Sequence, residues 1–290
     1  MKLFIKSIFI LIVILSLGIL AYLGFSFFRL FGDPTASDDL SVNINQVDGF
    51  QFIVMGDNEG DTAVFQELVD QASDIPAALF MHLGDLTPNA QEADFANVQA
   101  RLKTLPYPYY TAVGNNDIYK DPDKLKYQKY FSQSQLGLGM GENAYYSFDY
   151  KNAHFIVLDN SDRRVGFGDE QLNWLESDLS NNDSQWTFLI AHRPIDVPFS
   201  DVFGDDETPA SRESNERFTS IIKKYPITRM YVGHIHTLFS YSIGEIPVTI
   251  SGGGGAAPQE ALEDFLGPQF HFLEVTVTDS QVTQTVHRLE

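Results

Sequence analysis

The chain has 290 residues, of which 43% are hydrophobic and 20% are charged, a composition that is typical of a globular protein. Acidic residues outnumber basic ones by 39 to 19, and the net charge of −20 argues against binding to long nucleic acids or anionic lipid headgroups. Cysteine is absent from the sequence, which excludes disulfides and any thiolate nucleophile or metal ligand.

The first predicted element is an apolar segment near the N-terminus. The 22 residues between Lys6 and Arg29 carry no charge, and as a helix they would measure ~33 Å, enough to cross a membrane. Lysines precede the segment and aspartates follow it, so the positive-inside rule puts the N-terminus in the cytoplasm. We therefore predict a single-pass anchor over residues 1–31, with the rest of the chain extracytoplasmic. Secretion after cleavage of a signal peptide is the alternative.

Residues 32–48 are polar and rich in turn formers, so we predict a linker there, followed by one domain over residues 49–290. Apolar runs alternate with amphipathic stretches along this domain, which indicates an α/β protein with two sheets packed face to face and helices outside. Asp61 is the predicted N-cap of the first helix. The predicted strands are 51–55, 77–81, 109–113, 145–149, 153–158, 186–191, 228–232, 238–243, 246–250, 270–277 and 282–287. The predicted helices are 61–73, 91–103, 123–131, 169–180 and 213–224.

Five predicted strands end in the same way, with an apolar run followed by a small residue or histidine and a potential metal ligand. In α/β sheets, ligands bind beyond the carboxyl ends of strands, so these side chains are expected to converge. Each taken singly has a simpler explanation as a turn, a helix cap or a histidine bonded to a backbone carbonyl. Their combination favours a metal site. The residues are Asp57, Asp85, Asn115, His192 and the pair His234 and His236.

The order of "GDL", "GNND", "AHRP" and "GHIH" resembles the calcineurin-like metallophosphoesterase family, which includes the purple acid phosphatases. The resemblance extends from Gly56 to His236. It implies a four-layer α/β/β/α sandwich of two mixed sheets, and a hydrolase of phosphomonoesters or phosphodiesters. In such enzymes a hydroxide that bridges two divalent metal ions attacks phosphorus.

The resemblance also implies a role for each candidate ligand. Asp85 would bridge the two ions, with Asp57 and His236 on the first ion, and Asn115, His192 and His234 on the second. Carboxylate, amide and imidazole donors suit Mn, Fe or Zn. Bound metal would also supply the positive charge that a phosphate ester needs in so acidic a chain.

Two residues depart from the family pattern. Glu59 stands where the family has the histidine of Asp-x-His. It either binds the first ion, or points away so that water replaces it, or belongs only to the loop before the first helix. Asn116 stands where the family has a histidine that helps to bind phosphate and to protonate the leaving group. An amide cannot act as a general acid, so either the substrates have good leaving groups, or water, Asp117 or His154 provides the proton. His154 lies within a predicted strand, which favours a structural role.

Three loops are further candidates for shaping the site. Arg163 and Arg164 are candidates for contact with phosphate oxygens, but the favoured interpretation is ordinary surface ion pairing. The acidic segment 196–212 is a candidate lid, because long loops without periodicity are often functional. The glycine-rich segment 251–258 either lets the backbone approach the site or merely connects strands, and the connector is the favoured interpretation.

A phosphoesterase is therefore the predicted function, with a phosphate ester as substrate and the membrane reached through the N-terminal helix; no protein partner is predicted. One alternative is a non-catalytic metal-binding or interaction domain on the same fold, in which Glu59 and Asn116 mark the loss of activity. Retention of Asp85 and of the three candidate histidines favours the enzyme. A nuclease is a weaker alternative, because the net charge opposes a nucleic-acid track.

Overall fold

The structure is a computed structural model that describes residues 49–132, 137–138, 143–198, 208–258 and 270–289. The predicted anchor, the predicted linker and the central part of the predicted lid, residues 199–207, lie outside these ranges. Within the described ranges, no helix is both long enough and apolar enough to cross a membrane.

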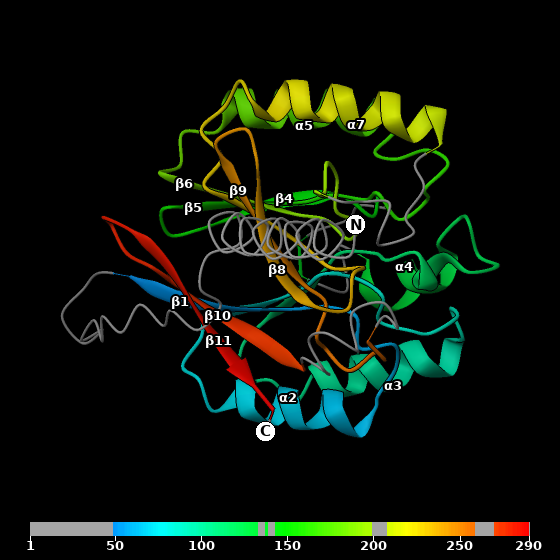
Figure 1. The fold of residues 1–290 in the computed structure, drawn as a ribbon. Helices are drawn as coiled ribbons and strands as arrows, with labels where there is room; N and C mark the ends of the chain where they lie inside the picture. Colours follow the sequence, from blue (N-terminus) through cyan, green and yellow to red (C-terminus); the bar gives the residue numbers. More distant parts are fainter. Residues whose placement is uncertain (1–48, 133–136, 139–142, 199–207, 259–269, 290) are drawn as a thin grey trace, which may run out of the picture. The chain divides into compact units, whose positions relative to one another are not determined.

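The described strands form two mixed sheets (Figure 1). In the first sheet, the strand order is β11-β10-β1-β2-β3. Strands β1, β2 and β3 are parallel to one another, whereas β10 is antiparallel to both β1 and β11. The bounds are β1 (Phe50–Met55), β2 (Leu79–His82), β3 (Tyr109–Thr111), β10 (His271–Val277) and β11 (Val282–Arg288).

In the second sheet, the strand order is β4-β5-β6-β7-β9-β8. The four inner strands β5, β6, β7 and β9 are parallel, and the two edge strands are antiparallel to their neighbours. The bounds are β4 (Tyr146–Tyr150), β5 (Ala153–Val157), β6 (Trp186–Ile190), β7 (Arg229–Val232), β8 (Leu238–Ile243) and β9 (Ile246–Ser251). Each sheet therefore has a block of parallel strands whose carboxyl ends share one edge.

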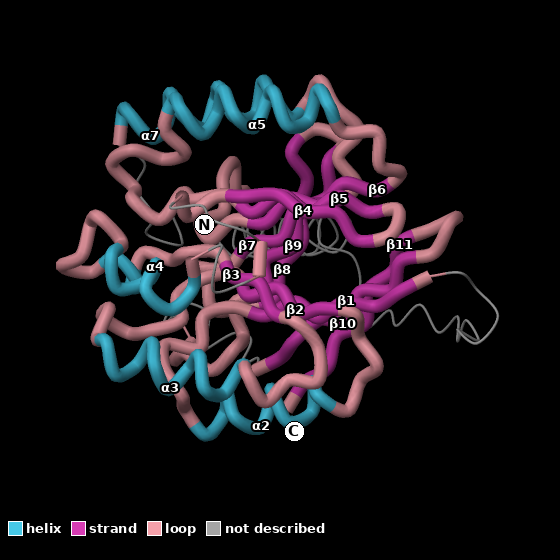
Figure 2. Tube along the Cα trace, turned by 180° about the vertical axis from the view of Figure 1, so that it is seen from behind, coloured by secondary structure: helices cyan, strands magenta, loops and turns pink. Residues whose placement is uncertain are grey.

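Helices cover the outer face of each sheet, as Figure 2 shows from behind. Apolar side chains of three helices pack on the first sheet, and those of two other helices pack on the second sheet. The helices on the first sheet are α2 (Ala63–Ser73), α3 (Glu92–Leu102) and α4 (Leu125–Phe131), and those on the second sheet are α5 (Asp169–Asn181) and α7 (Pro209–Ile222). A short 3₁₀ helix, η2 (Asn116–Ile118), follows β3. The arrangement is an α/β sandwich, as predicted.

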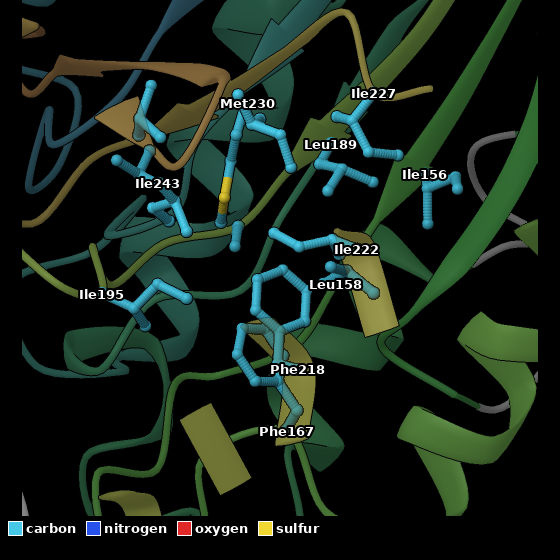
Figure 3. Close-up of a cluster of buried hydrophobic side chains, with 14 of the residues drawn as sticks. Ile156, Leu158, Phe167, Leu189, Ile195, Phe218, Ile222, Ile227, Met230 and Ile243 are labelled. Atoms are coloured by element: carbon cyan, nitrogen blue, oxygen red, sulfur yellow. The ribbon is translucent and has the colours of Figure 1, made fainter. Parts of the chain in front are cut away.

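Three apolar clusters hold the layers together. Between the sheets, the Phe52 ring meets Phe155 and Phe188 edge to face, with ring centroids 5.2 and 5.1 Å apart. In the outer cluster of the second sheet, Phe167 and Phe218 stack with centroids 4.2 Å apart (Figure 3). Burial of one such ring contributes roughly 1.5–3 kcal/mol. These clusters fix the sheets and hence the positions of the loops at their edges.

Each predicted strand and helix is present, and every boundary but one lies within two residues of its prediction. The exception is α7, which begins at Pro209 rather than at residue 213, because Thr208 and Ser211 form a capping box there. The predicted cap of α2 was also wrong: Thr62, not Asp61, is the N-cap, and its hydroxyl accepts the Phe65 N–H at 3.1 Å. The cap motifs were present in the sequence in both cases.

Candidate metal centre

The predicted ligands meet at the carboxyl ends of the parallel strands. Two groups of side chains have potential ligand atoms that all lie within 4.8 Å of one another, and Asp85 belongs to both groups. We call Asp57, Asp85 and His236 the first group, and Asp85, His192 and His234 the second group. The first group joins the loops after β1, β2 and β7, and the second joins those after β2, β6 and β7. Convergence from both sheets is thus observed, whereas the role of each residue as a ligand stays a prediction.

Glycines let these loops approach one another closely. A Cβ atom on Gly114 would lie 2.1 Å from Asp85 Oδ1, and one on Gly233 would lie 2.3 Å from Asp57 Oδ2. Asp57, Asp85 and His234 also have left-handed backbones, with φ of 62°, 52° and 70°. Such conformations cost free energy in residues other than glycine and are concentrated at functional sites. The packing of the loops therefore maintains a strained geometry at the candidate ligands.

His192 presents a lone pair to oxygen atoms that also carry lone pairs. Its Nδ1–H donates to the Leu83 carbonyl at 2.9 Å, which leaves Nε2 without a proton in the neutral ring. That Nε2 lies 3.0 Å from Asn115 Oδ1 and 3.4 Å from Asp85 Oδ1. Three electron-rich atoms that face one another are the arrangement that a cation would stabilise. A carbonyl that holds the opposite ring nitrogen is also the usual support of a metal-binding histidine.

His236 repeats this arrangement in the first group. Its Nδ1–H donates to the Ala257 carbonyl, so that Nε2 carries the lone pair. Nε2 lies 3.8 Å from Asp57 Oδ1 and 3.9 Å from Glu59 Oε1. Both groups therefore direct an imidazole nitrogen at carboxylate oxygens.

Burial makes the negative charge of the two aspartates costly. Asp57 is fully buried; its Oδ1 accepts the His234 N–H at 2.8 Å, and its Oδ2 has no hydrogen-bond partner among the described residues. Burial raises the pKa of Asp57 well above its usual value, against the His234 N–H, which lowers it. Burial and the neighbouring Asp57 likewise raise the pKa of Asp85. A bound cation would remove both penalties, so these residues fit a metal ion.

The histidines of the second group are held in the neutral form. Burial lowers the pKa of His192 and of His234 well below the usual value, and the neighbouring Arg193 guanidinium lowers both further. Their ring centroids are 5.2 Å apart at 77°. Neutral imidazole is the form that binds metal ions.

Glu59 and Asn116, the two departures from the family pattern, both face the centre and contact one another. Asn116 Nδ2 donates to Glu59 Oε1 at 2.8 Å and lies 3.0 Å from Asp85 Oδ2. The Asn116 backbone N–H donates to Asp85 Oδ1 at 2.8 Å. Glu59 therefore does not point away from the site.

Asp117 and His154, the two candidate replacements for the acid, both contact other parts of the fold. Asp117 is buried, and its carboxylate accepts the backbone N–H groups of Leu86, Thr87 and Gly114 at 3.2, 2.9 and 2.9 Å. Burial raises the pKa of Asp117 to about 6, although these hydrogen bonds oppose the shift. The carboxylate thus joins the loops after β2 and β3. His154 lies on β5 between two carboxylates outside both groups, which agrees with the predicted structural role.

Of the arginines near the site, the sequence prediction singled out two and overlooked a third. Arg164 is exposed and pairs with Asp162, its Nη2 lying 2.7 Å from Oδ2, which is the surface alternative. Arg163 is exposed, and its contact with phosphate stays a prediction. Arg193 Nη1 donates to Asn115 Oδ1 at 3.2 Å. Burial lowers the pKa of Arg193 to about 10, so the guanidinium is charged at neutral pH. Its place directly after His192 in "AHRP" was the available signal.

Asn160 and the glycine-rich segment also support the site. Asn160 Oδ1 accepts the N–H groups of His192 and Arg193 at 3.2 and 2.9 Å, and its Nδ2 donates to the Arg193 carbonyl at 2.7 Å. In the segment 251–258, the N–H of Ala256 donates to the Asp57 carbonyl at 2.8 Å. The prediction of a simple connector was wrong, because this segment packs against the β1 loop and also holds His236.

The comparisons with known proteins agree with this geometry. The chain is 24% identical over 168 residues to purple acid phosphatase 23 of Arabidopsis thaliana, a match that covers 52% of this chain and 35% of that protein. Purple acid phosphatase PPD1 from seeds of yellow lupin, Lupinus luteus, has the same fold, with a TM-score of 0.65 at 20% identity over 84% of this chain and 52% of that chain. GAP50, the anchor in the inner membrane complex of Plasmodium, matches with a TM-score of 0.57 at 14% identity over 83% and 89% of the two chains.

The chain thus spans about a third of the Arabidopsis protein (35%) and about half of the lupin protein (52%). The family model of the calcineurin-like phosphoesterases matches residues 50–238, which include both groups of candidate ligands. The chain belongs to the calcineurin-like phosphoesterase family.

Proposed function

We propose that this protein is a dinuclear metal-dependent phosphoesterase. The observation that carries the proposal is the pair of ligand groups that share Asp85. In each group an imidazole Nε2, fixed by a carbonyl on the opposite nitrogen, faces oxygen atoms of neighbouring side chains. The family to which the chain belongs consists of phosphoesterases, which supports a hydrolase.

In this proposal Asp57, Asp85 and His236 hold the first ion, and Asp85, His192 and His234 hold the second, together with the Asn115 amide oxygen. The mixture of carboxylate, amide and imidazole donors favours Mn, Fe or Zn. Two bound divalent ions would supply an activated water and offset negative charge on the phosphoryl oxygens.

Neighbouring residues hold the candidate ligands in place, and one of them is assigned to the substrate. Asn116 holds both oxygens of Asp85, and Asn160 holds the backbone of His192 and Arg193. The Arg193 guanidinium lies beside Asn115 at the edge of the second group, and we assign it to a phosphate oxygen. Because the protein carries a net charge of −20, such a local cation is needed to attract an anionic substrate.

The leaving group of the substrate is predicted to be a weak base. Asn116 has no acidic proton, and the carboxylate of Asp117 is enclosed by backbone donors. Turnover of a series of aryl phosphates should therefore fall steeply as the pKa of the leaving phenol rises. A shallow dependence would show that a general acid operates and would contradict this part of the proposal.

The main test measures the metal content and the activity of the full chain, purified in detergent. We expect about two equivalents of divalent metal per chain. We also expect metal-dependent turnover of an aryl phosphate monoester or diester, with kcat/KM lowered roughly a thousandfold in Asp85→Asn. Absence of bound metal, together with no activity after addition of Mn, Fe or Zn, would overturn the proposal. Metal binding without turnover would instead support the non-catalytic alternative, which the missing acid at Asn116 favours.

We also propose that the domain is held at the outer face of a membrane by residues 1–31. The 22 uncharged residues that follow Lys6 support this proposal. The protein should sediment with membranes and resist extraction by alkaline carbonate. Recovery of a shortened, soluble chain would favour cleavage of a signal peptide.

A further inference from the structure

We propose that Glu59 and Asn116 act as one unit, in which the Asn116 amide orients Glu59 as a third carboxylate ligand of the first ion. This inference rests on the proposed function and concerns the two positions where the chain departs from the family pattern. Asn116 is then a positioning residue rather than a substitute for the missing acid. The evidence comes from the backbone at Glu59, the hydrogen bonds of Asn116 and the balance of charge in the first group.

The loop that carries Glu59 is fixed against the loop after β2. The Glu59 N–H donates to the Asp85 carbonyl at 3.0 Å, and the Gly60 N–H donates to the Leu86 carbonyl at 2.8 Å. The side chain of Asn58 adds a bond to the same Leu86 carbonyl at 3.0 Å. Glu59 also has a left-handed backbone with φ of 46°, which is costly for a residue with a long side chain. These contacts maintain a conformation that brings the carboxylate to within 3.9 Å of His236 Nε2.

Asn116 joins this carboxylate to the shared aspartate. Its Nδ2 is 2.8 Å from Glu59 Oε1 and 3.0 Å from Asp85 Oδ2, so one amide group contacts both carboxylates. Since a primary amide has two N–H donors, each carboxylate can receive one of them. With its donors used in this way, Asn116 fixes the distance between Glu59 Oε1 and Asp85 Oδ2. The two departures are thus complementary: an acceptor at residue 59 matches a donor at residue 116.

The pairing of Glu59 with Asn116 adds a third carboxylate to the surroundings of the first ion. With Glu59, three carboxylates and one imidazole would surround the first ion, because Asp57 and Asp85 are already in place. Asp57 and Asp85 are buried, and carboxylates that face one another in such surroundings repel unless a cation lies between them. Asp57 Oδ2 is buried and has no hydrogen-bond partner among the described residues, so the first group contains an unsatisfied carboxylate oxygen. Oxygen-rich ligand sets favour hard ions such as Mn²⁺ over softer ones. We therefore assign Mn²⁺ as the preferred first ion.

The test measures Mn²⁺ binding to the metal-free full chain by calorimetry. Asp57→Asn identifies the binding step of the first group, and Asn115→Ala identifies that of the second. Glu59→Gln keeps a hydrogen-bond acceptor for Asn116 but removes the charge, so it is the conservative variant; Glu59→Asp, which withdraws the carboxylate, is the second. We expect each to weaken the first step at least about tenfold, with little effect on the second. Unchanged binding in both variants would overturn the inference.

A double-mutant cycle tests the pairing itself. Asn116→Ala should also weaken the first step about tenfold, and the double variant Glu59→Gln, Asn116→Ala should lose less than the two single losses combined. Losses that multiply independently would overturn the pairing. If the wild-type chain binds no metal at either step, the proposed function fails. If it binds two ions and hydrolyses its substrate while Glu59→Gln binds normally, only the pairing fails.

Discussion

The two ligand groups share Asp85 but differ in charge. The first group contains a second carboxylate, Asp57, and has Glu59 close by. The second group has two neutral imidazoles, an adjacent amide and the Arg193 guanidinium. One side of the centre is therefore suited to hold a cation strongly, whereas the other is suited to receive an anion. This asymmetry makes separate roles for the two halves testable.

Replacement of Asp85, which both ligand groups share, should have the largest effect, because it impairs both proposed ion sites at once. Asp85→Asn keeps the side-chain shape but removes the charge common to the two groups. Loss of about 4 kcal/mol of charge stabilisation corresponds to roughly a thousandfold fall in kcat/KM. Metal content and kcat/KM of the variant measure the effect. Two bound ions with near-normal turnover would show that Asp85 does not bridge the groups.

The next test separates the first ligand group from the second. His234→Ala should remove the second ion and leave the first in place, since His234 belongs only to the second group. His236→Ala is the matched control and should do the reverse. Binding of Mn²⁺ by calorimetry resolves the two steps. If either variant abolished both steps equally, the two groups would form a single site.

Arg193 tests whether the second group receives an anionic substrate. Arg193→Ala should raise KM, and the loss of a charge-assisted hydrogen bond of about 1.5–3 kcal/mol corresponds to a roughly ten- to hundredfold fall in kcat/KM. Arg193→Lys should recover part of the loss, because it restores a charge without the planar fork. Arg164→Ala is a matched control, since Arg164 is already paired with Asp162 at the surface. An equal effect of Arg164→Ala and Arg193→Ala would contradict the assignment to Arg193.

Much of the fold and of the centre follows from local sequence. Apolar runs that end in potential ligands could be recognised one by one, because a buried strand and its polar end are encoded by neighbouring residues. The parallel strand order then brings Asp57, Asp85 and the histidines together at one edge. Arg193 was overlooked, although it directly follows His192.

Contacts between distant loops could not be predicted in this way. The hydrogen bond from Asn116 to Glu59 joins residues that are 57 positions apart. It depends on the positive φ of Glu59 and on how the loops after β1, β2 and β3 pack, neither of which has a local signature. The support of His236 by the Ala257 carbonyl likewise comes from the fold.

The smallest predicted effect concerns His154. Its surroundings raise its pKa, whereas those of His192 lower the pKa of that ring. Burial lowers the pKa of His154, but hydrogen bonds to Asp178 and Asp149 outweigh burial and raise it above the usual 6.5. Its Nε2 lies 2.8 Å from Asp178 and its Nδ1 lies 2.6 Å from Asp149. The charged ring satisfies both carboxylates, which join β4, β5 and α5, whereas the neutral ring can donate to only one.

A raised pKa in the folded state means that this stabilisation is fully present below the unfolded value of 6.5 and is lost as pH rises through the folded value. Because the Asp149 side chain is 71% exposed, we expect a contribution of only about 1 kcal/mol, mostly from Asp178. The measurement is the free energy of unfolding of the wild type and His154→Gln at about pH 5.5 and about pH 8.5. The advantage of the wild type should shrink at the higher pH. An advantage that grew with pH would mean that the ring is neutral when folded, as in His192, and would remove the contrast between the two histidines.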